Sequence, residues 1–368
     1  MNFLTALIAL IASSATAHAA TPVADFVPSG WKILATAEGD LNSDGANEVA
    51  LALTSIDTHP ADPEAACPRR LLILERHGDQ LQRIAQNETM LLGCHDGGMF
   101  GDPFERIAIE RGVLVIRHYG GSNWRWRLTT RIRWQDGAWT VIGVTRENTA
   151  TIATNFLQST DYNVHTGLVV MQRRPEAGGK IKEQRFYQLL AGIAPSPPTV
   201  DGRAAAGEWH GAAIHLSDVR QVQRGAENWM GANDASANIQ AMVYGAQLYL
   251  LADVTDDVVT KDDTITLTGP SGRPIVPTQI AQLPHTNGYT VEAMYPLSAL
   301  SVTPIAARDE TMLPLSVNLI DVDAPKIVTT ELSSATPLHG GVIRLTPYLG
   351  LPHLDTFVRD QWMNIAEE

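Results

Sequence analysis

Short runs in which apolar and polar residues alternate, or in which apolar residues follow one another, cover most of the chain beyond residue 20. Alternation with a period of two is typical of a strand that packs on one face and meets water on the other. In the first half, the pattern predicts strands at residues 71–74, 107–116, 124–134 and 139–144. Asp136-Gly137 separates the last two runs, and this dipeptide is a strong signal for a β-hairpin turn.

The second half carries the same strand signals. Its clearest runs are residues 239–243, 247–254, 264–268, 289–293 and 315–322, and prolines interrupt the stretches between several of them. Short strands with turn residues at this spacing are typical of a β-sandwich. A helical pattern is suggested only near residues 150–158. The sequence therefore predicts a mainly all-β protein with two β-rich domains, the second a jelly-roll-like β-sandwich.

A proline-rich segment divides the two halves. Pro195, Pro197 and Pro198 fall within four positions, and proline neither continues a helix nor fits a central strand. Such a segment is expected to act as a semi-rigid spacer between domains. We therefore expect a first domain at residues 20–194, a linker at 195–198, a β-sandwich at 199–350 and a C-terminal tail at 351–368.

Residues 1–19 have the pattern of a signal peptide. An apolar run from Phe3 to Ile11 is followed by small residues and by Ala17-His18-Ala19, which is a small-x-small cleavage pattern. The alternative, an N-terminal membrane anchor, would need about 20 apolar residues, and this run is shorter. We expect cleavage near Ala20, no membrane span in the mature chain, and a periplasmic or secreted location.

The charge of the chain is strongly acidic and uneven. Lys and Arg number 27 and Asp and Glu number 40, which gives a net charge of −13. A surface this acidic argues against unaided binding to nucleic acid. Residues 1–195 hold 18 basic and 20 acidic residues (−2), whereas residues 196–368 hold 9 and 20 (−11). The excess of carboxylates makes divalent cations reasonable partners of the second half.

Cys67 and Cys94 are the two cysteines of the chain. In an oxidising compartment, an isolated pair most often forms a disulfide. A catalytic thiol is the alternative, because His95 and Asp96 directly follow Cys94. We expect the disulfide, since neighbours along a strand point to opposite faces and their closeness in sequence says little.

The segment from Asp40 to Glu48 has the spacing of a calcium loop. Oxygen-bearing side chains stand at its positions one, three, five and nine, and glycine at position six permits a tight turn. A strand pattern follows at residues 49–53, where an EF-hand loop would continue into a helix. The alternative is an Asx-rich turn without a metal. We expect calcium to be bound by Asp40, Asn42, Asp44, the Ala46 carbonyl and Glu48.

This segment resembles the calcium loop of FG-GAP and integrin-type repeats, which has a Gly-Asp-x-Asn-x-Asp-Gly core before a short hydrophobic strand. The residues that match this core are Gly39, Asp40, Asn42, Asp44 and Gly45. The one departure is Glu48, where that family usually has Asp. A β-propeller would need several copies and the chain has one, so the resemblance implies a structural calcium site and no propeller.

Several short signatures follow one another in the second half. They are Val200-Asp201-Gly202 with Glu208-Trp209, then residues 241–244, 248–257, 262–267, 288–292 and 296–300, and finally 317–323. Their order resembles the family 9 carbohydrate-binding module and its DOMON-like relatives. The resemblance implies a non-catalytic β-sandwich that binds sugar in some members and holds structural calcium.

Acidic residues of this half suit the implied calcium. Clustered carboxylates repel one another unless a cation or a basic partner neutralises them. The alternative is a solvated acidic rim. The candidates for a second metal site are Asp253, Asp256, Asp257, Asp321 and Asp323.

Two loops are candidates for ligand binding. Sugar rings stack on exposed aromatic faces, and Trp229 is the better platform of the second half, with Asn228, Asn233 and Asp234 as hydrogen-bonding neighbours. In the first half, Gly120-Gly121 forms a hairpin tip with the composition of a binding loop; the alternative there is a hairpin whose tryptophans pack in the core. The residues of this second loop are Tyr119, Asn123 and Trp124. Residues 100–105 nearby resemble stretches of uncharacterised exported bacterial proteins, which supplies no activity.

Motifs of hydrolases, metalloproteases, nucleotide-binding loops and dinucleotide-binding folds are not found in the sequence. A glycosidase needs a pair of carboxylates, but the sequence selects no pair among 40 acids. No catalytic residue is assigned, and whether the protein is an enzyme stays open.

We expect an exported, non-catalytic binding or accessory protein with calcium-stabilised β domains and carbohydrate as the ligand of the second. The alternatives are a secreted glycan hydrolase, with its active site in the first domain or between the domains, and a structural or protein-interaction module. The sequence determines neither the ligand nor the oligomeric state.

Overall fold

The computed structural model describes residues 21–56, 67–135, 137–151, 157–174, 179–211, 213–300, 311–323, 330–335 and 341–346. Within these ranges the regular secondary structure is almost entirely β-strand, and the helices are short 3-10 turns, so the predicted all-β class is confirmed. The helices are η1 (Val23–Phe26), η2 (Val219–Gln221) and η3 (Leu297–Leu300). The expected signal peptide and C-terminal tail lie outside the described residues.

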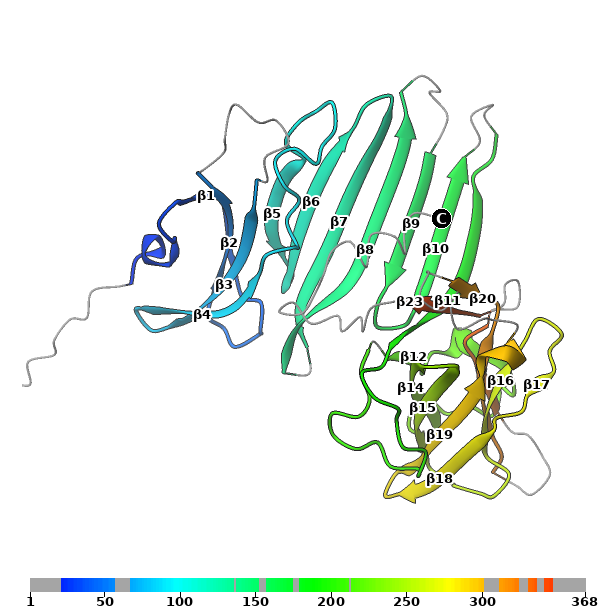
Figure 1. Ribbon diagram of the computed structural model, residues 1–368. Coiled ribbons are helices and arrows are strands. Elements are labelled where there is room, and N and C mark those ends of the chain that lie inside the picture. Colours follow the sequence, from blue (N-terminus) through cyan, green and yellow to red (C-terminus); the bar gives the residue numbers. More distant parts are fainter. Residues whose placement is uncertain are drawn as a thin grey trace, which may run out of the picture.

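The first half of the chain forms two antiparallel sheets that follow each other along the sequence (Figure 1). The smaller sheet contains β1 (Trp31–Gly39), β2 (Glu48–Ser55), β3 (Arg69–His77) and β4 (Gln80–Asn87). The larger sheet runs through β5 (Phe104–Glu110), β6 (Val113–Gly121), β7 (Trp124–Gln135), β8 (Ala138–Ala150), β9 (Leu157–Asn163), β10 (Leu168–Arg174) and β11 (Lys182–Ile193). The predicted hairpin joins β7 to β8 with Gly137 at a φ of 79°.

Alternation along the strands decides how these two sheets pack. Ala50 and Ile73 of the smaller sheet share one core with Ile116 and Leu128 of the larger sheet. The opposite face of the smaller sheet, which includes Leu51, forms a second apolar cluster that residues near the N-terminus of the described chain cover. Of the segment near residues 150–158, for which the sequence suggests a helical pattern, β8 ends at Ala150 and β9 begins at Leu157, and residues 152–156 lie outside the described residues.

Strand β11 belongs to both halves of the protein. Residues 182–187 pair with β10 in the large sheet. Residues 188–192 then pair with β23 (Val342–Thr346), and residues 191–193 pair in parallel with β14 (Ala235–Tyr244). The expected domain boundary near residue 194 therefore comes directly after β11, whose last residues already belong to a sheet of the second half. Backbone hydrogen bonds thus join the two halves before the proline-rich segment begins at Pro195.

The second half is a sandwich of two sheets. One layer continues from β11 through β14 and contains β12 (Ile214–Leu216), β15 (Gln247–Asp256), β18 (Gln279–His285), β19 (Gly288–Pro296), β20 (Thr311–Leu313) and β23. The other layer contains β13 (Val222–Arg224), β16 (Thr264–Thr268), β17 (Pro274–Ile275), β21 (Ser316–Asp321) and β22 (Thr330–Ser333).

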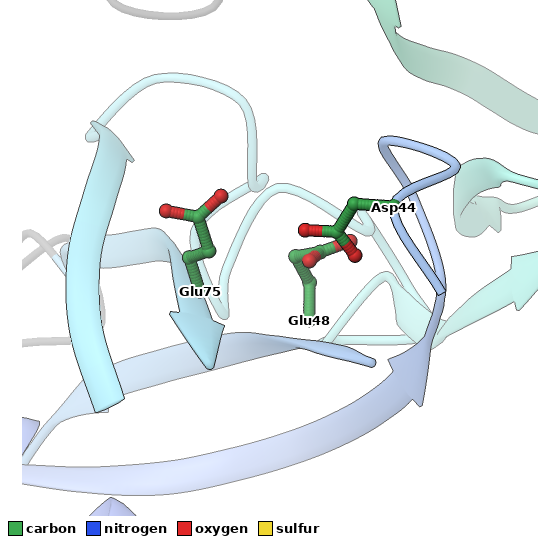
Figure 2. Close-up of side chains that lie close together, drawn as sticks. All are labelled: Asp44, Glu48 and Glu75. Atoms are coloured by element: carbon green, nitrogen blue, oxygen red, sulfur yellow. The ribbon is translucent and has the colours of Figure 1, made fainter. Parts of the chain in front are cut away.

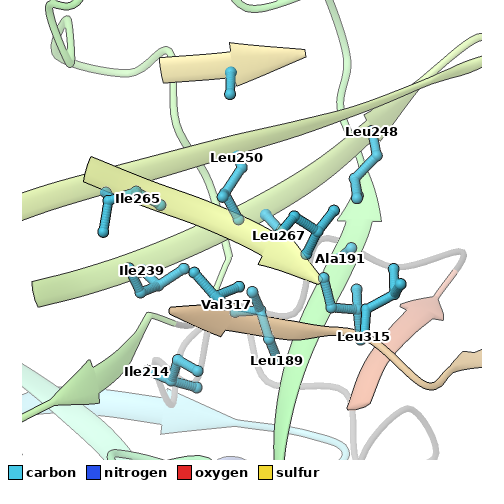
Figure 3. Packing of buried hydrophobic residues seen from close by; sticks show 14 of the residues in the cluster. Leu189, Ala191, Ile214, Ile239, Leu248, Leu250, Ile265, Leu267, Leu315 and Val317 are labelled. Carbon is cyan, nitrogen blue, oxygen red and sulfur yellow. The ribbon is translucent and has the colours of Figure 1, made fainter. Parts of the chain in front are cut away.

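One apolar core fills this sandwich. Figure 3 shows apolar side chains of the two layers packed together, among them Leu250 of β15, Leu267 of β16 and Val317 of β21. Along β15 the inward row consists of Leu248, Leu250, Ala252 and Val254, and all four side chains are buried. The period-two pattern of the sequence therefore places these residues in the core, as predicted.

A buried carboxylate ties the start of the second half to this sandwich. Glu292 on β19 is fully buried, and its Oε2 accepts hydrogen bonds from the backbone N–H groups of Asp201 and Gly202, each at 2.8 Å. Its Oε1 accepts a hydrogen bond from the Trp209 indole at 2.9 Å. Three donors compensate one buried charge, as the burial of an ionised group requires. Asp201, Gly202, Trp209 and Glu292 are therefore one hydrogen-bonded group that holds the start of the second half against the sandwich.

Cys67 and Cys94 form the predicted disulfide, with their Cα atoms 5.5 Å apart. The bond joins the segment before β3 to the loop between β4 and β5. No helix in the described ranges is long and apolar enough to cross a membrane.

Candidate functional site

Three aspartates meet at one end of the sandwich core. Asp256 is the next inward position of β15 after Val254, and it is 4% exposed. Asp263 precedes the inward residue Ile265 of β16 by two positions, and Asp321 follows Leu319 of β21 by two. Each aspartate therefore continues a row of core residues, and the alternation that buries the apolar side chains buries these carboxylates too.

These three carboxylates are close enough to share a cation. One oxygen from each of Asp256, Asp263 and Asp321 lies within 4.8 Å of the others, and all three residues are buried. Asp263 accepts hydrogen bonds from the backbone N–H groups of Thr260 and Val322. In contrast, the Oδ2 atom of Asp256 is buried without a hydrogen-bond partner, and so is the hydroxyl of Tyr289.

Burial makes the charged forms of two of these aspartates unfavourable. Desolvation, together with the neighbouring carboxylates, raises the pKa of Asp256 to about 6. Desolvation and the charges of nearby aspartates, Asp323 first, raise the pKa of Asp321 to about 7. Carboxylate oxygens at this density and burial are the donor set that calcium takes, and a bound dication reverses the local electrostatics. The residues therefore fit a calcium ion.

A second group of carboxylates extends this cluster toward the surface. Oxygens of Asp234, Asp321 and Asp323 lie within 4.8 Å of one another, so that Asp321 belongs to both groups. Asp234 is buried, and its Oδ2 accepts a hydrogen bond from the Met230 N–H at 2.8 Å. We call the five residues Asp234, Asp256, Asp263, Asp321 and Asp323 the acidic cluster.

The acidic cluster overlaps the expected second metal site but is not identical to it. Asp256, Asp321 and Asp323 were expected, whereas Asp263 was not, although it shares the inward phase of Ile265. Asp253 lies three positions before Asp256 on β15, so it is on the opposite face, where its Oδ1 contacts His285 Nε2 at 3.1 Å. Asp257 is exposed and belongs to neither group of described acids.

The expected calcium loop between β1 and β2 is folded by its own side chains. Asp40 accepts hydrogen bonds from the N–H groups of Ser43 at 2.6 Å and Gly45 at 3.1 Å. Asn42 Oδ1 accepts one from the Asp44 N–H at 3.0 Å. Gly45 has a φ of 86°, which glycine adopts without strain. Asp40 and Asn42 therefore shape the turn, with their oxygens engaged by the backbone.

The carboxylates that gather at this loop are Asp44, Glu48 and Glu75, and Figure 2 shows all three. Glu48 is fully buried, and its Oε2 accepts a hydrogen bond from the Leu41 N–H at 2.6 Å while its Oε1 has no hydrogen-bond partner. Burial raises the pKa of Glu48, and the nearby Asp44 adds to this rise.

Glu75 joins this site from β3, far away in the sequence. Val49 pairs with Leu74, so the next residues of the two strands, Glu48 and Glu75, stand opposite each other. Like charges in that position are destabilising, which a cation would relieve. The sequence could not show this neighbour, because the register between β2 and β3 depends on their pairing.

Trp229 lies at the edge of the sandwich core. Its side chain is half-buried and packs against the core, and its indole N–H donates a hydrogen bond to the Ala235 carbonyl at 2.8 Å. Asn228 and Asn233 are exposed beside it, whereas Asp234 belongs to the acidic cluster. The loop thus offers one ring face, and sugar binding there stays a prediction.

The candidate loop of the first half is a closely packed hairpin tip. The Phe100 and Tyr119 rings lie 5.6 Å apart between centroids, and the Arg125 guanidinium stands 4.8 Å from the centroid of Phe100. Trp124 is 53% exposed and Asn123 is exposed. The tryptophan at this tip is therefore on the surface, although Trp126 packs against the core.

Comparison with known proteins gives one distant structural likeness to report. No protein-family model matches the chain, and no curated protein matches it. Among solved structures, the chain is similar to a family 9 carbohydrate-binding module from Caldicellulosiruptor kristjanssonii in complex with glucose. The identity is 15%, the match covers 43% of this chain and 94% of that chain, and the TM-score is 0.28. At this TM-score the likeness carries no argument, and the fold described above rests on the strand pairing.

Proposed function

We propose that this protein is an exported, non-catalytic binding protein whose two β units are stabilised by calcium and whose second unit binds carbohydrate. One observation carries the calcium part: Asp256, Asp263 and Asp321 lie within 4.8 Å of one another in a buried place. Removing charges from water costs several kcal/mol for each ion unless partners compensate them. Calcium bound by these oxygens would neutralise the buried carboxylates and link the two layers of the sandwich at one end.

Calcium would also act on the loop that carries Trp229. Asp234 stands five residues after Trp229, accepts a hydrogen bond from the Met230 N–H and lies beside Asp321 and Asp323. A cation held by these carboxylates would fix Asp234 and, through it, the backbone beside the ring. The proposal therefore includes a calcium-dependent affinity for sugar, since an ordered loop loses less entropy on binding.

The test is isothermal titration of the full mature chain with a panel of neutral mono- and oligosaccharides, in calcium and in EDTA. Sugar binding that weakens in EDTA supports the proposal. Absence of heat with every sugar would leave a structural or protein-interaction module, the second alternative from the sequence. Reducing ends released in the same mixtures would instead indicate the hydrolase alternative.

Export is the part that rests on the sequence pattern of residues 1–19. Mass spectrometry of protein recovered from the periplasm or medium is expected to find an N-terminus near Ala20. An intact chain beginning at Met1 would contradict export with cleavage.

A further inference from the structure

Arginines gather on the face of the large first-half sheet that turns away from its core. Ile116 of β6 and Leu128 of β7 are buried in that core, so the alternate residues of these strands face outward. The outward positions of β5, β6 and β7 include Arg106, Arg117, Arg125, Arg127 and Arg131.

These side chains line two adjoining hollows. The larger has a volume of about 570 Å³, and four arginines line it, together with two glutamates: Arg106, Arg117, Arg127, Arg131, Glu105 and Glu147. The smaller, of about 310 Å³, shares Arg127 and Glu147 and adds Tyr119 and Arg125. Because two residues are common to both, the hollows form one open depression across β5 to β8, which we call the arginine groove.

The arginine groove is positive within an acidic protein. Its five arginines stand beside four carboxylates: Glu105 and Glu147 line the groove, and Glu110 and Asp161 lie 3.0 Å from Arg106 and 3.7 Å from Arg131. The net charge of this group is +1, whereas the whole chain carries −13. Arg127 is loosely paired, at 3.5 Å from Glu105 and 3.7 Å from Glu147. Arg117 makes no ion pair with any residue that the structure describes. The guanidinium groups of Arg117 and Arg127 are therefore available to an anionic ligand.

We propose that the arginine groove binds an acidic polysaccharide through its uronate carboxylates. A guanidinium group offers two parallel N–H donors that match a carboxylate. Glu105, Glu147 and Thr145 supply acceptors and a hydroxyl between the arginines, which suits a ligand whose carboxylates alternate with hydroxyl groups. Phe100, 47% exposed beside Tyr119, adds an aromatic surface at the rim for the apolar face of a sugar ring.

The same features disfavour other polyanions. A DNA backbone carries no hydroxyl groups that could donate hydrogen bonds to Glu105 and Glu147, whereas a uronate chain does. Attraction by a net +1 extends only about 8 Å at physiological ionic strength, so a DNA duplex or a vesicle would also meet the acidic remainder of the protein. This site is separate from the Trp229 loop, and it stands whether or not that loop binds sugar.

The experiment is isothermal titration of the full mature chain with a hexamer of galacturonate, with its methyl ester as the neutral control. Binding is expected for the acid and not for the ester, with an affinity that falls as sodium chloride is raised from about 50 to about 500 mM. Arg117→Gln and Arg127→Gln are each expected to weaken binding about tenfold or more, as for a lost charge-assisted hydrogen bond. Arg127→Lys should recover only part of the affinity, because an ammonium group cannot bind bidentately.

The controls separate this site from the rest of the protein. Arg224→Gln removes an exposed arginine of the second half, paired with Glu331, and should leave the affinity unchanged. Binding should persist in EDTA, because EDTA removes any calcium that could bridge the acidic cluster to a uronate. Thermal unfolding midpoints should confirm that the variants fold. Equal affinity for acid and ester, wild-type affinity in both glutamine variants, or tighter binding to DNA or phospholipid vesicles would overturn the proposal.

Discussion

Replacing Asp256 by Asn removes one buried charge from the end of the sandwich core and keeps the shape of the side chain. The Asn carbonyl oxygen can still accept the hydrogen bond from the Val258 N–H, which Asp256 Oδ1 accepts at 2.8 Å. The amide nitrogen would take the place of Oδ2, which has no hydrogen-bond partner, and could donate to a neighbouring carboxylate. The variant should therefore fold.

The size of the effect follows from the pKa of Asp256, which burial raises from 3.8 to about 6. At a pH above both values, Asp256 is charged in the folded and the unfolded state, and the charge is less favourable in the buried folded site. It therefore lowers the free energy of unfolding by ~3 kcal/mol. In EDTA the free energy of unfolding of the wild type should fall by this amount as the pH rises from about 4 to about 6, because the folded state binds the proton more tightly than the unfolded state does. Below pH ~4 both states are protonated and the effect disappears.

The assay is thermal unfolding of wild type and Asp256→Asn in EDTA and in calcium. In EDTA at pH 8, the variant should melt about 6–12 °C higher, at 2–4 °C for each kcal/mol. In calcium the order should change, because the wild type gains about 4.1 kcal/mol at a thousandfold excess over the dissociation constant and the variant gains little. Asp257→Asn, the same change at an exposed neighbour, should change the free energy of unfolding by no more than about 0.5 kcal/mol in either solution. A variant that is less stable in EDTA, or that keeps the full calcium effect, would refute the reasoning.

Three further changes test the other sites. Glu48→Gln should abolish the calcium-dependent rise in the unfolding midpoint of the first half, since this buried carboxylate has an oxygen without a partner; Glu38→Gln on the exposed side of β1 is the control, and an unchanged calcium effect in Glu48→Gln would contradict the site. Replacing Cys67 and Cys94 by Ser should lower the free energy of unfolding by about 3–4 kcal/mol through loop-closure entropy; equal denaturant midpoints of oxidised wild type and double variant would count against it. Trp229→Ala should weaken sugar binding about tenfold or more, as for the loss of a stacking contact of about 1–3 kcal/mol, whereas Trp229→Phe keeps a ring and should retain most of the affinity; identical titrations for Ala and wild type would remove Trp229 from the site.

The all-β class, the positions of most strands and the turn between β1 and β2 could be predicted from the sequence. These features are local: alternation with a period of two assigns faces, and Asp40, Asn42 and Gly45 fold their loop through contacts within five residues. The cysteine pair could also be predicted from the sequence, because a chain with two cysteines allows one internal disulfide.

Which carboxylates lie together depends on strand pairing and packing. Glu75 reaches Glu48 because β2 and β3 pair in one register, and a shift by one residue would send its side chain to the other face. Asp256, Asp263 and Asp321 come from three strands in two layers, and they converge because their rows end at the same edge of the core. The sharing of β11 between the two halves is likewise a matter of non-local pairing. Side-chain periodicity states the face on which a residue lies, but the neighbour across a sheet or a core depends on strand order, register and packing, which no local pattern contains.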